Sequence, residues 1–111
     1  NDAVKAFVKD LKQQHRFDDV MLFTFSEVGR RVEQNASGGT DHGTANNMFL
    51  VSGGLKQKGI LNAMPDLKDL NEGDLKYNVD FKNVYATVLK KWLNADDKSI
   101  LTKQYDYLNF I

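Results

Sequence analysis

The chain has 111 residues, and its 15 basic and 15 acidic side chains give a formal net charge of zero. This length fits one domain, and the balanced charge gives no indication of binding to nucleic acid or to an anionic membrane. The absence of cysteine excludes disulfides and thiolate sites, and no apolar run approaches the roughly 20 residues of a membrane span.

The first predicted element is a helix near the N-terminus. Asp2 is expected to cap this helix, and its apolar stripe has the spacing i, i+3, i+4 and i+7: Val4, Phe7, Val8 and Leu11. The run 20–25 is then almost continuously apolar, which predicts a strand covered on both faces. A helix that leads directly into such a strand is half of a parallel crossover unit, whose other strand comes earlier. We therefore expect residues 1–111 to be a single segment of a larger domain.

The middle of the chain is rich in glycine. Seven of the eight glycines lie between Gly29 and Gly59, which predicts a loop, with a second short buried strand at 48–52 inside it. Residues 59–79 are expected to be irregular. A second helix follows, capped by Asp80 and ending at 94–97, and it has a wide apolar face: Val84, Tyr85, Val88, Leu89, Trp92 and Leu93. The tail 98–111 is expected to pack along the outside of the sheet.

Three side chains in the glycine-rich region are candidate metal ligands. Asp41 and His42 are adjacent in a loop of small residues, and Glu27 follows the first predicted strand. Carboxylate oxygens and imidazole nitrogens are good ligands for zinc, manganese and similar ions, and flanking glycines let the backbone approach closely. The alternative is that Asp41 and His42 are turn residues that bond their own backbone and that Glu27 is simply solvated.

Two arginines lie close to these candidate ligands. Arg30 and Arg31 have the chemistry to bind a phosphate or sulfate oxyanion bidentately beside a metal ion. The alternative is a pair of surface arginines without a ligand. No catalytic residue is assigned, because the chain has only two histidines and no Gly-x-Ser-x-Gly elbow.

Six segments carry a combined motif: Phe23–Arg31, Asn35–Asn46, Phe49–Lys56, Gly73–Tyr77, Asp80–Leu89 and Trp92–Leu93. Together they resemble a bacterial family, the domain of unknown function 1501, and the resemblance covers nearly the whole chain.

This resemblance implies a fold and a superfamily. Members of the family are much longer, are typically exported, and are similar to sulfatases and alkaline phosphatases. The implied fold class is α/β, and the chain is the C-terminal part of an alkaline-phosphatase-like α/β/α sandwich with a mainly parallel sheet. The implied location is periplasmic or exported. Carried over by position, Glu27, Asp41 and His42 hold a divalent metal ion, although the superfamily usually has Asp at the strand end and His or Asn where Val28 stands.

Two functions follow from this reasoning. The first is a metal-dependent hydrolase of phosphate or sulfate esters, with Arg30 or Arg31 holding the oxyanion of a small anionic substrate. The nucleophile then lies in a missing N-terminal part of the same protein, so the isolated chain is expected to be inactive. The second is a non-catalytic protein of the same descent that binds an anionic glycan or an assembly partner. Unpaired sheet edges also allow a homo-oligomer.

Overall fold

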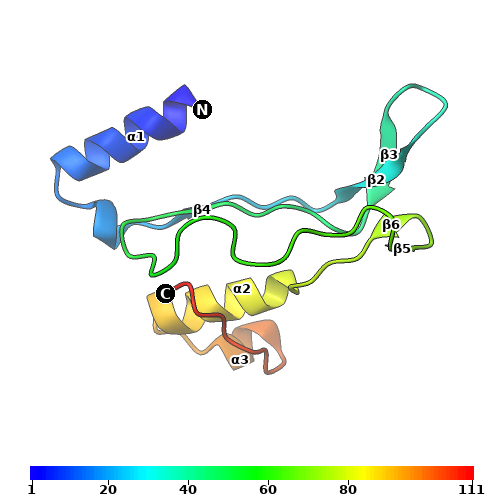
Figure 1. The fold of residues 1–111 in the computed structure, drawn as a ribbon. Helices are drawn as coiled ribbons and strands as arrows, with labels where there is room; N and C mark the ends of the chain where they lie inside the picture. Colours follow the sequence, from blue (N-terminus) through cyan, green and yellow to red (C-terminus); the bar gives the residue numbers. More distant parts are fainter.

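The computed structural model describes residues 1–111 as an elongated assembly of short elements (Figure 1). Three two-stranded antiparallel sheets, β1–β4, β2–β3 and β5–β6, lie between an N-terminal helix and a C-terminal helical unit. The elements are α1 (Asp2–Gln13), the 3-10 turn η1 (Phe17–Asp19), β1 (Leu22–Phe23), β2 (Gly29–Gln34), β3 (Thr40–Gly43), β4 (Leu50–Val51), β5 (Leu70–Asn71), β6 (Asp74–Leu75), α2 (Phe81–Thr87), its π-helical continuation η2 (Val88–Trp92) and α3 (Asp97–Leu101).

The predicted N-terminal helix is confirmed, with a different cap. Asn1 rather than Asp2 caps α1, because the Asn1 side-chain oxygen accepts the backbone N–H groups of Ala3 at 2.9 Å and Val4 at 3.4 Å. The helix stands apart from most of the chain (Figure 1), and none of its residues is buried. Neither α1 nor any other helix is long and apolar enough to cross a membrane.

The two predicted apolar strands form, but they are short and exposed. The runs 20–25 and 48–52 contribute only β1 and β4, which pair with each other antiparallel. No residue of either strand is buried, and just beyond them Phe25 is 70% exposed and Phe49 is 67% exposed. The prediction that both strands are buried on two faces is therefore wrong. A larger, mainly parallel sheet of the alkaline-phosphatase type stays a prediction, which these antiparallel pairs do not test.

The glycine-rich region is more regular than predicted. Instead of one loop it contains the β2–β3 hairpin, and the segment expected to be irregular contains the β5–β6 hairpin. Glu72 (φ 51°) and Gly73 (φ 88°) connect β5 to β6, and two consecutive residues of positive φ are the mark of a type I′ turn. At the base of the other hairpin Gly29 is buried, because the Ala45 carbonyl occupies the space where a side chain would lie.

The helical unit at the C-terminus holds most of the core. As predicted, Asp80 caps α2, and its carboxylate accepts the Lys82 N–H at 2.8 Å. The tail packs on this helix rather than along a sheet, because the Leu108 N–H donates to the hydroxyl of the buried Thr87 at 2.8 Å. In the same tail Phe110, 1% exposed, is the largest fully buried side chain. The prediction for the tail is corrected accordingly.

A second polar contact joins the tail to α3. Asp96 caps α3, and hydrogen bonds from the Ser99 hydroxyl and N–H lower the pKa of Asp96. Its neighbour Asp97 is 3% exposed and accepts the Tyr107 hydroxyl, which lies 3.0 Å from each carboxylate oxygen. Partial burial raises the pKa of the Tyr107 phenol, and the hydrogen bond to Asp97 raises it further.

We predict that Gly29→Ala destabilises the chain by about 3 kcal/mol, at the upper end for overpacking. The added methyl group would lie 1.6 Å from the Ala45 carbonyl oxygen, so the hairpin base has to move. Gly39→Ala is the matched control, because its methyl group would have no neighbour closer than 3.7 Å. Urea denaturation measures both variants. Equal midpoints for the two variants would contradict the close approach at Gly29.

We also predict that the stability advantage of the wild type over Tyr107→Phe declines above pH 10. The folded state raises the pKa of Tyr107 above its ordinary value of 10.0, so it favours the neutral phenol. This contribution is fully present below pH 10 and is lost as the pH rises through the folded-state pKa. Urea denaturation midpoints of both proteins at pH 8 and pH 11 test this prediction. These pH values lie about 2 units below and 1 unit above the ordinary pKa of tyrosine. A constant difference between the two proteins would contradict the role of the phenol.

Candidate functional site

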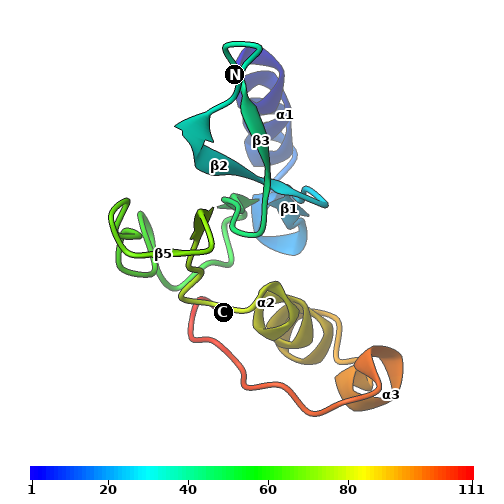
Figure 2. The ribbon, with the colours of Figure 1, turned by 90° about the vertical axis from the view of Figure 1, so that its right-hand side faces the viewer.

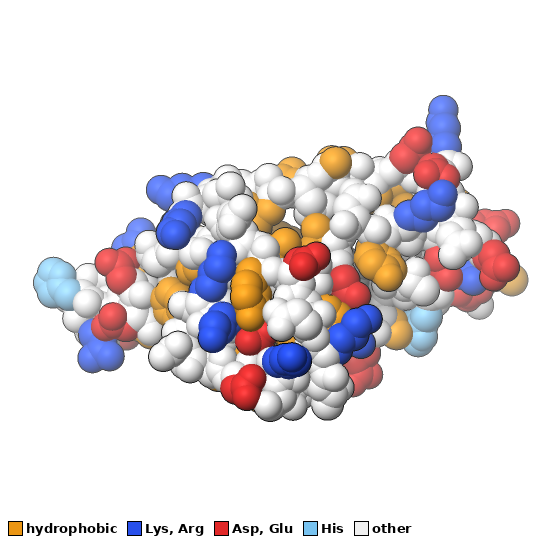
Figure 3. Space-filling model, turned by 90° about the horizontal axis from the view of Figure 1, so that it is seen from below, with side chains coloured by type: hydrophobic (Ala, Val, Ile, Leu, Met, Phe, Trp, Pro, Cys, Tyr) orange, Lys and Arg blue, Asp and Glu red, His pale blue; other side chains and the backbone are white.

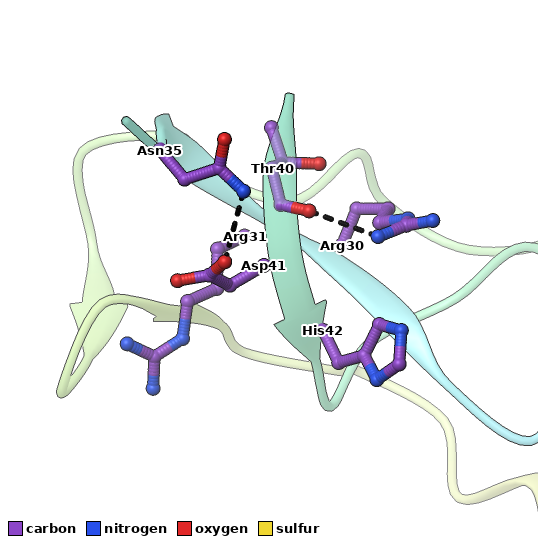
Figure 4. Close-up of a pocket in the computed structure, with 6 residues that line it drawn as sticks. All are labelled: Arg30, Arg31, Asn35, Thr40, Asp41 and His42. Atoms are coloured by element: carbon purple, nitrogen blue, oxygen red, sulfur yellow. Dashed lines mark hydrogen bonds between the residues drawn. The ribbon is translucent and has the colours of Figure 1, made fainter. Parts of the chain in front are cut away.

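The β2–β3 hairpin projects from the body of the molecule (Figure 1). It carries an open, polar hollow, whose lining residues are drawn in Figure 4. The hollow has a volume of about 510 Å³, and no hydrophobic residue lines it. Its lining residues are Arg30, Arg31, Asn35, Thr40, Asp41 and His42.

Strand alternation divides these side chains between two faces of the hairpin. Arg30 and His42 are direct cross-strand partners in the register, and both side chains point to the same face (Figure 4). Arg31 and Asp41 are their neighbours in sequence and point to the opposite face. Successive residues of a strand point to opposite sides of a sheet, so this division follows from the backbone.

The first face is cationic. Arg30 donates from Nη1 to the Thr40 carbonyl oxygen at 2.9 Å, which holds the guanidinium beside β3 (Figure 4). A guanidinium has five N–H donors, so most of them remain available. His42 is exposed on the same face, and none of the residues lining this side of the hollow is acidic. We call this pair of Arg30 and His42 the cationic face.

The second face is held by an ion pair to the other hairpin. The Arg31 Nε lies 3.1 Å from an Asp74 carboxylate oxygen on β6, and the Asp74 side chain is only 18% exposed. On this side Asp41 accepts the side-chain amide N–H of Asn35 at 3.0 Å. The oxygen of the same Asn35 amide accepts the Ser37 and Gly39 N–H groups, so it also shapes the turn at the hairpin tip.

The comparison with known proteins identifies the family. The model of the family described as "Protein of unknown function (DUF1501)" matches residues 1–107. The chain belongs to this family. Neither the curated proteins nor the solved structures give a significant match. The family description states no activity.

The predicted metal ligands of this DUF1501 chain are only partly brought together. Asp41 and His42 share the hollow but lie on opposite faces of β3. Glu27 does not line the hollow, and it lies in an exposed bend after the end of β1 rather than directly at a strand end. No three His, Asp or Glu side chains in the 111 residues lie close enough to hold one metal ion. A divalent metal site at these residues stays a prediction.

Three residues of the site were not predicted. Asn35 and Thr40 belong to the hollow, and Asp74 anchors Arg31 from a position 43 residues away in the sequence. The turn-forming sequence after Asn35 signals the hairpin tip. No local pattern signals the pairing of Arg31 with Asp74.

We predict that the isolated DUF1501 chain does not bind zinc or manganese tightly. Structural sites usually need four ligands, and the geometry allows Asp41 and His42 to point at one ion only after β3 is rearranged. Calorimetric titration with each metal, alongside His42→Ala as control, measures this. One tightly bound ion per chain that is lost in His42→Ala would show a complete site.

Proposed function

We propose that this chain binds the oxyanion group of a small phosphate or sulfate ester on the cationic face of the β2–β3 hairpin. The observation that carries this proposal is the direct cross-strand pairing of Arg30 with His42. Directly paired residues have their Cβ atoms about 5 Å apart, so both side chains reach one anion. The function is that of a binding protein, the non-catalytic alternative among the two functions considered above.

The chemistry of the two side chains suits an oxyanion. The Arg30 guanidinium is planar, and two parallel N–H groups match two oxygens of a phosphate or sulfate group. Its hydrogen bond to the Thr40 carbonyl limits the freedom that would otherwise be lost on binding. The His42 imidazole adds one further N–H donor from the opposite strand.

Arg31 has a different role in this proposal. Its guanidinium is already engaged by Asp74, and Asp41 adds a second carboxylate to the same face. An anion on that face would meet a net negative environment. We therefore assign Arg31 to holding the hairpin in place and Arg30 to contacting the ligand.

The polar lining of the hollow limits the class of ligand. Because no hydrophobic side chain lines it, little apolar area of a ligand would be buried there. Recognition then rests on the charged group, and the organic part of the ester extends into solvent or against another polypeptide. This arrangement suits a sulfated or phosphorylated sugar better than an aromatic ester.

A metal-dependent hydrolase of phosphate or sulfate esters is the second candidate. It is favoured by one observation, the presence of Asp41 and His42 in the same hollow as Arg30. In that case, a divalent ion bound with help from an N-terminal part of the protein would polarise the ester oxygen. Arg30 would hold the oxyanion in the same way under both functions.

The test of the proposal is a titration of the labelled chain with inorganic sulfate, inorganic phosphate and a glucose sulfate, followed by backbone amide NMR shifts. We expect shifts confined to β2 and β3. Arg30→Gln is expected to weaken binding about tenfold or more, since a hydrogen bond to a charged group contributes about 1.5–3 kcal/mol. Arg16→Gln is the control of equal charge change, because Arg16 pairs with Asp19 away from the hollow.

Two results would decide against the proposal. One is the absence of hairpin shifts with all three anions, and the other is equal weakening by Arg30→Gln and Arg16→Gln, which would indicate a non-specific charge effect. Turnover of an aryl phosphate or aryl sulfate that requires added metal and is lost in His42→Ala would instead establish the hydrolase.

A further inference from the structure

The side-chain hydroxyl of Thr40 makes no hydrogen bond within the molecule. Each of the other threonine hydroxyls has an internal partner: those of Thr24, Thr44, Thr87 and Thr102. Thr40 is engaged through its carbonyl oxygen, which accepts the hydrogen bond from Arg30 Nη1. Its hydroxyl is not a buried atom, because no buried side-chain oxygen or nitrogen lacks a hydrogen-bond partner. The Thr40 hydroxyl is therefore accessible to a ligand.

This hydroxyl belongs to the cationic face. Thr40 and His42 lie two residues apart on β3, so their side chains point to the same side of the strand. Figure 4 shows the Thr40 hydroxyl on the side of β3 where Arg30 and His42 also lie. The extra residues of the hairpin are on β2, so they do not disturb the alternation along β3. Three hydrogen-bond donors from two strands therefore line one side of the hollow.

The cationic face is open to solvent. β3 is an edge strand that pairs only with β2, and the hairpin stands clear of the helices (Figures 1 and 2). The end of the molecule that carries the hairpins is rich in charged side chains (Figure 3). Gln34, the residue opposite Thr40, already donates from its side chain to the Gly38 carbonyl at 3.1 Å. It does not compete for the Thr40 hydroxyl.

The spacing of the donors fits a tetrahedral oxyanion. Residues two apart on a strand are separated by about 7 Å. An oxyanion with one hydrogen bond of about 2.8 Å on each side fits between groups at that spacing. The Arg30 guanidinium, 2.9 Å from the Thr40 carbonyl, lies beside the hydroxyl. Its two parallel N–H groups bind two oxygens in one plane, so a donor outside that plane is available for a third oxygen.

We propose that the Thr40 hydroxyl donates to the third terminal oxygen of a sulfate or phosphate monoester and makes the site selective for monoesters. This inference rests on the function proposed above and specifies its ligand class. A monoester group has three terminal oxygens, whereas a carboxylate or a diester has two. Arg30 can bind two oxygens of any of these groups, and only a monoester offers a further one to Thr40. Thr40 is thus a specificity-determining residue.

The experiment compares glucose 6-sulfate with glucuronate, two sugar ligands of the same charge at neutral pH that differ in the number of terminal oxygens. The labelled full chain is titrated with each ligand, and the amide NMR shifts of β2 and β3 give the affinities. We expect the wild type to bind glucose 6-sulfate more tightly. Thr40→Val is expected to weaken this binding about tenfold, the effect of losing a hydrogen bond to a charged group, and to leave glucuronate binding unchanged.

Two further variants serve as controls. Thr40→Ser keeps the hydroxyl, so it is expected to keep the preference for the sulfate ester. Thr44→Val makes the same change outside the hollow, just beyond β3, where the Thr44 hydroxyl donates to the Leu75 carbonyl at 3.4 Å. It is expected to leave both affinities unchanged. The bond from Arg30 to the Thr40 carbonyl is to the backbone, so substitution of the Thr40 side chain does not remove its acceptor.

The outcomes separate this proposal from the function on which it rests. A Thr40→Val chain that keeps the wild-type preference would overturn the role of Thr40. Equal weakening for both ligands would do the same, because it would show a structural effect of the substitution. In both cases hairpin shifts that depend on Arg30 would leave the oxyanion function standing. Absence of hairpin shifts with both ligands would overturn the function and the role of Thr40 together.

Discussion

The hydrogen bond from the Leu108 N–H to the buried Thr87 hydroxyl of α2 is the contact on which much of the molecule depends. It fixes the tail on the helix, and two residues later the carbonyl of the buried Phe110 accepts the Lys56 N–H at 2.8 Å. The turn at Gly53 and Gly54, just before Lys56, packs closely on both sides. Gly54 lies against the ring of Trp92, and the Gly53 N–H donates to the Phe17 carbonyl at 3.1 Å. Successive contacts therefore connect the C-terminal tail, through this turn, to η1. Because no residue of α1 is buried, the position of α1 depends on its connection to η1.

The helices α1 and α2 were predictable from the sequence, whereas the short helix α3 and the pairing of the strands were not. Apolar spacing and a capping Asp80 locate α2, because both signals act within a few residues. A continuous apolar run such as 20–25 indicates that burial of these residues is favourable, but it does not identify the segments that pack against them. Phe23 contacts the Tyr85 ring at 6.1 Å between centroids, while Phe25 remains in solvent. Glycine content was equally ambiguous, since Gly29 lies at the start of a strand and permits a close approach of the Ala45 backbone, where the sequence indicated a loop.

The candidate site was predicted residue by residue but not as an arrangement. Arg30, Asp41 and His42 were recognisable from their chemistry and from their proximity in the sequence. Which of them face each other depends on strand register, and the register rests on long-range pairing that no local pattern encodes. The same applies to Arg31, whose partner Asp74 lies on β6 of a different hairpin. Neighbours in sequence such as Asp41 and His42 are separated by the pleat of the strand.

The irregular register of the β2–β3 hairpin has a consequence for how this region can change in length. Arg30 lies opposite His42 and Gln34 lies opposite Thr40, so β2 carries two more residues than β3 between these pairs. An even surplus keeps the inward and outward order of side chains on both sides of the bulge. Loss or gain of one residue at 32 or 33 would exchange the faces on the tip side, at Gln34 and Thr40, whereas Arg30, Arg31 and His42 at the base would keep theirs. Related chains that keep the same faces on both sides of the bulge are therefore expected to vary in length here by pairs of residues.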